Sequence, residues 1–114
     1  MSTDYSKMSD FEINLRVAEI LVDYDCISRL PYTDMAVHWG DGANWHVFNP
    51  CNNPADSWPI ITENNIAVVP YKHTIPQAWP TSFGLVSKFT TEDRNPLRAA
   101  MITFLKMQEP KNAS

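Results

Sequence analysis

The stretch Cys51-Asn52-Asn53-Pro54-Ala55-Asp56-Ser57-Trp58-Pro59-Ile60-Ile61 carries the strongest structural signal in this chain of 114 residues. Asn53 is a good N-cap residue, because its side-chain oxygen can accept a hydrogen bond from an N–H of the first helical turn. Pro54 suits the first helical position, where its N–H would be unpaired anyway and its φ is already helical. Asp56 places a negative charge near the positive end of the helix dipole. The stretch therefore predicts a helix that begins at Pro54.

Pro59 lies deeper in the same helix, where a proline removes one backbone hydrogen bond and clashes with the preceding turn. It also favours extended geometry for the residue before it. We therefore expect the helix to kink or restart at this point and to end near Glu63 or Asn64. We expect Trp58, between the helix start and Pro59, to be part of the core.

A second Asn-Pro pair, Asn95-Pro96, begins another predicted helix near the C-terminus. We expect this helix to end at Pro110 and to be followed by a flexible tail over residues 110–114. Its apolar face consists of residues that recur at helical spacing: Leu97, Ala100, Met101, Phe104 and Leu105.

The N-terminal region begins with residues 1–8, which are polar and expected to be flexible. Ser9-Asp10-Phe11-Glu12 then reads as a capping box, in which Ser9 accepts from the N–H of Glu12 and Glu12 reaches back to the N–H of Ser9. The helix that follows should end near Asp23. Its apolar stripe contains Phe11, Leu15, Ala18 and Leu21 or Val22, and it is widened by Ile13, Val17 and Ile20.

The centre of the chain shows strand signals. Asp41-Gly42 between two short β-prone runs predicts a hairpin over residues 35–48. If the turn is centred on this pair, His38 lies opposite Trp45, and His46 lies on the other face. Further strands are expected near 66–71 and 83–89, with an irregular loop over 72–82 because of its prolines. Residues 24–34 are ambiguous, although Cys26, Ile27 and Leu30 could form a short strand.

This order of elements predicts a single α+β domain over residues 9–109. A small, mainly antiparallel sheet, built from the hairpin 35–48 and the strands near 66–71 and 83–89, would be packed by the N-terminal, central and C-terminal helices. The composition, with 44% hydrophobic residues, is that of a globular domain.

Charge and hydropathy narrow the classes of partner. The net charge of −4 argues against non-specific binding to nucleic acid, whose phosphates repel an acidic surface. No apolar run approaches the length of a membrane span, and the polar first ten residues do not resemble a signal peptide. We therefore expect a cytoplasmic protein with no membrane partner, in which Cys26 and Cys51 are free thiols.

The sequence offers two weak catalytic or metal-binding signals. His38, His46, His73, Cys26 and Cys51 are the candidate soft ligands, but no two of them have the close spacing of a zinc site. We expect no metal and no cofactor. Cys51 precedes a helix start, where a thiol pKa can fall, yet a nucleophile would also need a positioned histidine. We therefore assign no catalytic residue.

The two Asn-Pro helix starts are the better candidate site. Helix N-termini can bind anions, and Arg98 on the first turn of the last helix could add a bidentate donor. Asp56 would repel an anion, so an Asp56–Arg98 ion pair that joins the two starts is the simpler interpretation. If a pocket exists here, we expect it to be formed by Asn52, Asn53, Asp56, Trp58 and Arg98.

The chain contains four tryptophans, which can serve either a core or a binding surface. Trp45 lies in the hairpin and Trp79 in the proline-rich loop, so these two are the expected exposed anchors. A binding surface would then comprise the hairpin and loop 72–82.

The central block, together with Glu63-Asn64, resembles the signature of the NinX-like family of bacteriophage proteins. Asp93-Arg94-Asn95-Pro96-Leu97-Arg98-Ala99-Ala100-Met101-Ile102 and the opening Asp4-Tyr5-Ser6-Lys7-Met8-Ser9-Asp10-Phe11-Glu12-Ile13-Asn14 resemble it as well. Regions 24–48 and 66–90 match less well. The resemblance implies an accessory protein of a phage or prophage, made inside the bacterial host. It implies no known activity and no catalytic residue.

Two functions follow from these observations. The first is a non-enzymatic module that binds a host or phage protein during infection. The alternative is a small-molecule or nucleotide-binding protein, possibly hydrolytic, with its pocket at the two Asn-Pro helix starts. A symmetric homodimer is also possible, because such dimers are the commonest closed oligomers.

Overall fold

The computed structural model describes residues 4–28, 36–40, 44–82 and 88–112. The elements, in chain order, are η1 (Tyr5–Lys7), α1 (Asp10–Leu21), η2 (Tyr24–Cys26), β1 (Val37–Gly40), β2 (Trp45–Phe48), α2 (Pro54–Glu63), β3 (Ile66–Val69), β4 (Gln77–Pro80), β5 (Thr91–Glu92) and α3 (Pro96–Asn112). This content confirms the α+β class.

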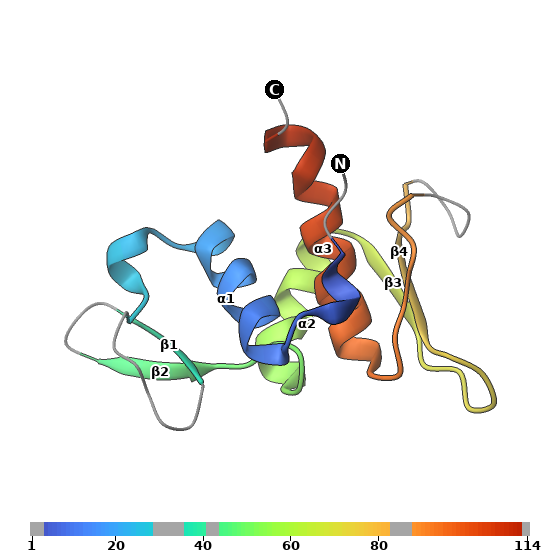
Figure 1. Ribbon diagram of the computed structural model, residues 1–114, viewed down its shortest axis with the longest axis horizontal. Coiled ribbons are helices and arrows are strands. Elements are labelled where there is room, and N and C mark those ends of the chain that lie inside the picture. The colour runs from blue at the N-terminus through green and yellow to red at the C-terminus, as the bar shows by residue number, and fades with distance from the viewer. Residues whose placement is uncertain (1–3, 29–35, 41–43, 83–87, 113–114) are drawn as a thin grey trace.

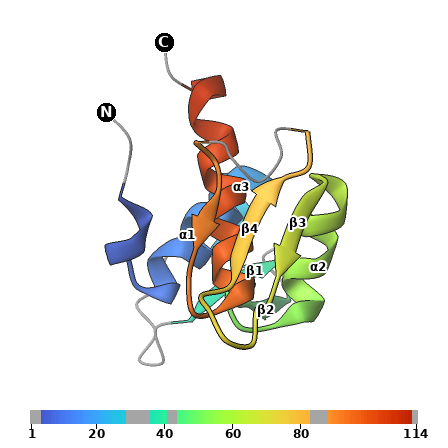
Figure 2. The ribbon, with the colours of Figure 1, turned by 90° about the vertical axis from the view of Figure 1, so that its right-hand side faces the viewer.

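Helix α3 lies at the centre of the molecule (Figure 1). The antiparallel sheet β3-β4-β5 packs against one side of it, and α1 and α2 contact it elsewhere (Figure 2). The hairpin β1-β2 projects at the opposite end of the long axis from the β3-β4 turn, and it contacts the core through α1. The long-range packing therefore converges on α3, and its residues 98–105 are all buried.

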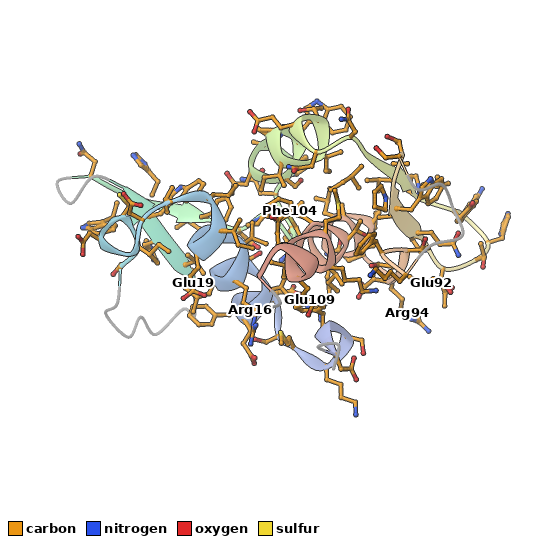
Figure 3. The ribbon with its side chains drawn as sticks, turned by 90° about the horizontal axis from the view of Figure 1, so that it is seen from above. Arg16, Glu19, Glu92, Arg94, Phe104 and Glu109 are labelled. Atoms are coloured by element: carbon orange, nitrogen blue, oxygen red, sulfur yellow. The ribbon has the colours of Figure 1, made fainter. Side chains whose placement is uncertain are left out.

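The core is an apolar cluster drawn from all three α-helices and from strands of both sheets. Phe104, labelled in Figure 3, belongs to the part contributed by α3. The cluster contains Tyr5, Ile13, Val17, Ala18, Ile27, Val37, Phe48, Cys51, Ile60, Ile61, Ile66, Ala78, Ala99, Ala100, Met101, Ile102, Phe104 and Leu105.

The strands form two sheets and not the one sheet that the sequence suggested. β1 and β2 make a two-stranded sheet, and β3, β4 and β5 make a three-stranded one. The short strands cannot join because their sheets lie at opposite ends of the molecule (Figure 1). The expected strand near 66–71 is confirmed as β3, which ends just before Pro70.

The hairpin forms, but its register differs from the one centred on Asp41-Gly42. His38 lies opposite Val47, and Gly40 lies opposite Trp45. Four residues therefore separate the paired strand ends, where a two-residue turn was expected. Each strand is displaced by one residue, so His38 and His46 still lie on opposite faces, as predicted. A Cβ at Gly40 would come within 1.8 Å of the Asn44 carbonyl oxygen, which requires glycine at this position.

The expected loop 72–82 is wrong in part, because β4 occupies Gln77–Pro80. Pro80 is tolerated since it is the last residue of this strand, paired with Ile66 at the end of the ladder. The expected strand near 83–89 lies mostly outside the described residues, and its described end, residues 88–89, is a turn. The third strand is instead β5. Cys26 of the ambiguous region 24–34 lies in η2, and Ile27 forms an isolated bridge to Trp39.

Helix α1 has the predicted N-cap, since Ser9 Oγ accepts from the N–H of Glu12 at 3.2 Å. The Glu12 carboxylate accepts from Ser9 Oγ at 3.4 Å, in place of the predicted bond to the Ser9 N–H. The buried face is Ile13, Asn14, Val17 and Ala18, whereas Ile20 and Leu21 are exposed. The apolar stripe is thus rotated toward Ile13 and Val17, and the helix ends at Leu21.

Pro59 and Pro110 both lie within helices of the structure. α2 is a single helix that runs through Pro59 to Glu63, within the expected end. α3 continues past Pro110 to Asn112, so the prediction that Pro110 ends it is wrong. Pro110 lies in the last turn of α3, where the loss of one backbone hydrogen bond matters little, whereas Pro59 lies inside α2 and removes a hydrogen bond from its interior. After α2, Asn65 adopts φ 52°, a left-handed conformation that asparagine tolerates, and turns the chain into β3.

Candidate functional site

The two Asn-Pro blocks meet through the side chain of Asn95. Its Nδ2 donates to the Cys51 carbonyl oxygen at 2.6 Å and to Asn52 Oδ1 at 3.1 Å. Asn52 Nδ2 in turn donates to Asp10 Oδ2 at 3.1 Å. The starts of α1, α2 and α3 are therefore joined in one polar cluster, which we call the helix-start junction.

Arg98 forms the other half of the junction and is 8% exposed. Its Nη1 donates to Asp10 Oδ1 at 2.6 Å, and its Nε donates to Asp93 Oδ2 at 3.0 Å. Its Nη2 donates to the carbonyl oxygens of Tyr5 and Met8. Burial lowers the pKa of Arg98, but hydrogen bonds to Asp10 and Asp93 outweigh burial and raise this pKa above its ordinary value. Arg98 thus remains charged and ties the N-terminal segment to α3.

A second layer of the junction was not foreseen from the sequence. Asn14, buried on α1, accepts from the Cys51 N–H at 3.1 Å and donates to Asn49 Oδ1 at 2.8 Å. These two hydrogen bonds hold the loop before α2 in place, and they satisfy polar groups of the loop that would otherwise need water as a partner. The available signal was a polar residue placed between Ile13 and Val17 in the apolar stripe of α1.

The predicted Asp56–Arg98 ion pair is wrong. Asp56 Oδ2 accepts from the Asn49 N–H at 2.9 Å and closes the loop just before its own helix. Arg98 pairs with Asp10 and Asp93. A carboxylate in the first turn of α2 has local backbone donors within reach, so it satisfies the loop, while Arg98 meets two other carboxylates.

The backbone donors of both Asn-Pro helix starts are already used. In α2, Asn53 Oδ1 accepts from the Ala55 N–H, and the Asn53 carbonyl accepts from the N–H groups of Asp56 and Ser57. In α3, Asn95 Oδ1 accepts from two N–H groups, those of Leu97 at 3.0 Å and Arg98 at 3.3 Å. Prolines occupy the remaining first positions. These starts therefore offer an anion no free N–H of the kind that helix-terminal anion sites use.

Cys51 lies at the centre of the junction and is fully buried. Burial, reinforced by the charge of Asp10, raises the pKa of the Cys51 thiol to about 12. A nucleophilic cysteine needs the opposite shift. Both cysteines are free thiols, and the described residues contain no group of three His, Cys, Asp or Glu side chains that could hold a metal ion.

The structure brings together only part of the predicted pocket. Asn52 and Arg98 meet through the carboxylate of Asp10. Asn53 only caps α2, and Asp56 faces the loop. The prediction that Trp58 belongs to the core is wrong, because Trp58 is 62% exposed on the outer side of α2.

The other two predicted anchors lie at a distance from the junction. Trp45 is 38% exposed on β2, and Trp79 is half-buried on β4. Figure 1 places their sheets at opposite ends of the molecule, so the hairpin and loop 72–82 do not form one continuous surface.

The chemistry of the junction is that of a structural cluster. Among the described residues, every buried side-chain nitrogen and oxygen has a hydrogen-bond partner. A fully satisfied polar network rigidifies a fold and specifies one arrangement of its elements. The structure thus defines a small α+β domain whose N-terminal segment and three helix starts are joined by one set of charged and amide side chains.

The chain belongs to the family described as Bacteriophage P22, NinX, whose model matches residues 4–108. The match spans the junction and both sheets. The chain matches no curated protein and no solved structure. Within its described part, no helix is both long and apolar enough to cross a membrane.

Proposed function

We propose that this protein is a non-enzymatic phage accessory protein, made in the cytoplasm of the bacterial host, that binds a host or phage protein during infection. The partner supplies an extended segment that adds to the outer edge of β2. The observation that carries this proposal is the edge strand Trp45–Phe48, which contains no Lys, Arg, Asp or Glu and whose first three residues are exposed.

The two edges of the hairpin differ. The outer edge of β1 is covered by residues 27–28, since Ile27 forms a bridge to Trp39 and the Ser28 N–H donates to the His38 carbonyl at 2.9 Å. Within the described part of the chain, β2 pairs with β1 alone. An open strand edge presents backbone donors and acceptors that an extended peptide can pair with.

The side chains of β2 suit this mode of binding. Trp45 and Val47 share its outward face and are 38% and 53% exposed. Behind them, Trp39 stacks on Phe48 with ring centroids 3.8 Å apart, which supports the strand from the core side. β2 contains no Lys, Pro or acidic residue of the kind that protects edge strands in other proteins. Backbone pairing would supply affinity, and the alternate side chains Trp45 and Val47 would supply selectivity.

The nucleotide alternative receives less support. Its pocket residues are engaged in capping, in the junction or at the surface, and their donors already have protein partners. A ligand would have to displace these bonds before it gained any of its own.

The test is affinity purification from infected host cells, followed by mass spectrometry, with the wild-type chain and matched variants. Val47→Asp places a negative charge on the outward face of β2. Trp45→Ser removes the aromatic anchor from the same face. Ile75→Asp is the control, because Ile75 is 44% exposed and belongs to the connection between β3 and β4. Figure 1 shows this connection at the opposite end of the molecule from the hairpin. We expect one protein to be recovered with wild type and I75D and to be lost with V47D and W45S. Recovery that is the same with all variants, or repeated failure to recover any partner, would refute the proposal.

A further inference from the structure

The hydrogen bonds of β1 show which backbone groups of β2 point to its outer edge. The carbonyl oxygen of His38 accepts from the Ser28 N–H at 2.9 Å, so His38 directs its backbone groups away from β2. Neighbouring residues of an extended strand direct their N–H and C=O groups to opposite sides. Val37 and Trp39, on either side of His38, therefore direct theirs toward β2.

In β2, the partners of these two residues are Phe48 and His46, whose backbone groups thus point to β1. Trp45 and Val47 alternate with them, so the N–H and C=O groups of Trp45 and Val47 point to the outer edge. The edge therefore offers two donors and two acceptors to an incoming strand. The side chains of the same two residues are exposed, so a residue opposite either one meets its backbone and its apolar side chain together.

The outer edge of β2 ends at a carboxylate. Asn49 is the next residue in the same alternation, and its N–H donates to Asp56 Oδ2 at 2.9 Å. The Asn49 carbonyl accepts from the N–H groups of Asn52 and Asn53, so both backbone groups of Asn49 have partners and the open edge stops there. Figure 1 shows β2 running toward α2, which carries Asp56 in its first turn. A negative charge therefore lies beside the path of a strand that pairs with β2.

The described residues around the hairpin have the same sign of charge. Segments 22–28 and 36–56 comprise η2, the hairpin and the start of α2. Their described residues contain three carboxylates and no Lys or Arg, the carboxylates being those of Asp23, Asp25 and Asp56. Complementary charge steers a partner to a surface, and charge of the same sign rejects it. This end of the molecule therefore favours a basic segment over an acidic one.

We propose that the segment which pairs with β2 is basic and runs antiparallel to it, with the pattern basic–x–apolar–x–apolar. The inference rests on the proposed function and adds the chemistry of the partner. The two apolar residues lie opposite Val47 and Trp45, and because each antiparallel pair exchanges two hydrogen bonds, these two residues satisfy all four outward groups. The basic residue then lies opposite Asn49, where its long side chain reaches the carboxylate of Asp56.

The first test compares three synthetic peptides by NMR titration of the full chain. The basic probe has the core Lys-Thr-Val-Thr-Val between Gly-Ser ends, and the neutral and acidic probes carry Ser or Glu in place of Lys. At low salt we expect the basic probe to bind most tightly and the acidic probe to bind at least roughly fivefold more weakly. Added salt should reduce this difference, because it screens the charges. Equal affinities, a preference for the acidic probe, or no binding of the basic probe would overturn the proposal.

The same titration locates the bound peptide. With the basic probe, hydrogen exchange of the Trp45 and Val47 amides should slow, because these two donors become bonded to the peptide. The amides of His46 and Phe48 already face β1 and should change little. Protection that appears elsewhere on the chain but not at Trp45 and Val47 would contradict the register.

The second test removes the charge at the end of the edge. Asp56→Asn keeps an oxygen that can accept from the Asn49 N–H but has no carboxylate, so the affinities for the basic and acidic probes should come to within about twofold of each other. Glu63→Gln is the matched control, because Glu63 is exposed at the other end of α2, and it should leave the preference unchanged. A full preference for the basic probe in D56N would overturn the assignment of Asp56.

The affinity purification tests the proposed function separately. A partner that is lost with V47D, but whose β2-binding segment is acidic or uncharged when mapped by hydrogen exchange, would uphold the proposed function and overturn this inference. A partner whose recovery is unaffected by V47D would refute the proposed function, whatever its charge. The preference among the three probes is measured on the purified chain and does not depend on that purification.

Discussion

Replacement of Arg98 by Met tests whether the helix-start junction stabilises the fold. The substitution keeps most of the aliphatic stem but removes hydrogen bonds to Asp10 at 2.6 Å and to Asp93 at 3.0 Å. It also removes the donors for two backbone carbonyls of the N-terminal segment, those of Tyr5 and Met8.

The magnitude follows from the exposure of each partner. The Asp93 side chain is 18% exposed, so it is left largely desolvated without its cation. The Asp10 side chain is 45% exposed, and water screens that pair, so it contributes no more than about 1 kcal/mol. Loss of one member of a buried, hydrogen-bonded pair costs about 3–5 kcal/mol. We therefore expect the free energy of unfolding of Arg98→Met to fall by about 3–5 kcal/mol, a large part of the ~5–15 kcal/mol of a typical domain.

The assay is urea unfolding followed by tryptophan fluorescence, in which such a loss lowers the midpoint by roughly 2–3 M for a typical dependence on denaturant. Arg98→Lys should lie between wild type and R98M, because one ammonium group cannot reproduce the planar fork. Arg94→Met is the matched control, since Arg94 is exposed and its side chain points away from the domain (Figure 3). A value for R98M within about 1 kcal/mol of wild type would refute the reasoning, because a pair that was screened throughout costs no more than that.

Three further comparisons test other parts of the structure. Asn95→Ala removes a helix cap and two hydrogen bonds of the junction, whereas Asn53→Ala removes only a cap. Chemical denaturation should therefore show a free energy of unfolding that falls by about 1–3 kcal/mol more in Asn95→Ala than in Asn53→Ala. Equal losses would contradict a stabilising role of the junction. Trp58→Ala in dilute protein should change stability by less than about 1 kcal/mol. Trp39→Ala, which removes the stacked ring, should cost about 2–4 kcal/mol; the reverse order would contradict the fold. Because burial raises the pKa of Cys51 from 9.0 to about 12, the folded state keeps a proton that the unfolded state loses. The thiol's contribution is therefore complete below pH 9 and falls by up to about 1.4 kcal/mol per pH unit between pH 9 and 12. The free energy of unfolding should therefore decrease less between pH 9 and 12 in Cys51→Ala than in the wild type. An equal decrease in both proteins would exclude the effect.

The helix starts are the part of this fold that could be predicted from single residues. Ser9, Asn53 and Asn95 each cap the helix that the sequence assigned to them. A cap needs only the side chain of one residue and the N–H groups two or three positions later. The information is therefore contained within a few consecutive residues.

The strands were harder to predict because their pairing depends on distant residues. β4 forms between Pro76 and Thr81, in a stretch where prolines suggested a loop, because β3 and β5 pair with its two sides. The hairpin was predicted, but its two-residue turn was wrong, and the pairing is displaced by one residue on each strand. The observed register pairs Val37 with Phe48, and both side chains are buried in the core. The register is therefore explained by this packing and not by the turn sequence.

The partners of charged and aromatic side chains could not be read from the sequence. Arg98 lies five residues after Asp93 but 88 positions after Asp10, and only the folded chain brings both carboxylates to one guanidinium. Tryptophan is a residue type that often lies in a core. In α2, however, the buried face is the one that contains Ile60 and Ile61, and Trp58 lies on the other side. Helical spacing alone leaves the direction of a face open when apolar residues occur on both sides.

The sequence by itself therefore determined the family, the α+β class and the three helix starts, because capping and turn chemistry act over a few bonds along the chain. Only the tertiary structure decided that the Asn-Pro blocks join through Asn95 and Asn52, that Arg98 holds the N-terminal segment, and that Trp58 faces solvent. These outcomes depend on which surfaces α3 buries when distant segments pack around it. They show that the Asn-Pro blocks form a hydrogen-bonded junction, and they leave apolar side chains of β2 and of α2 exposed.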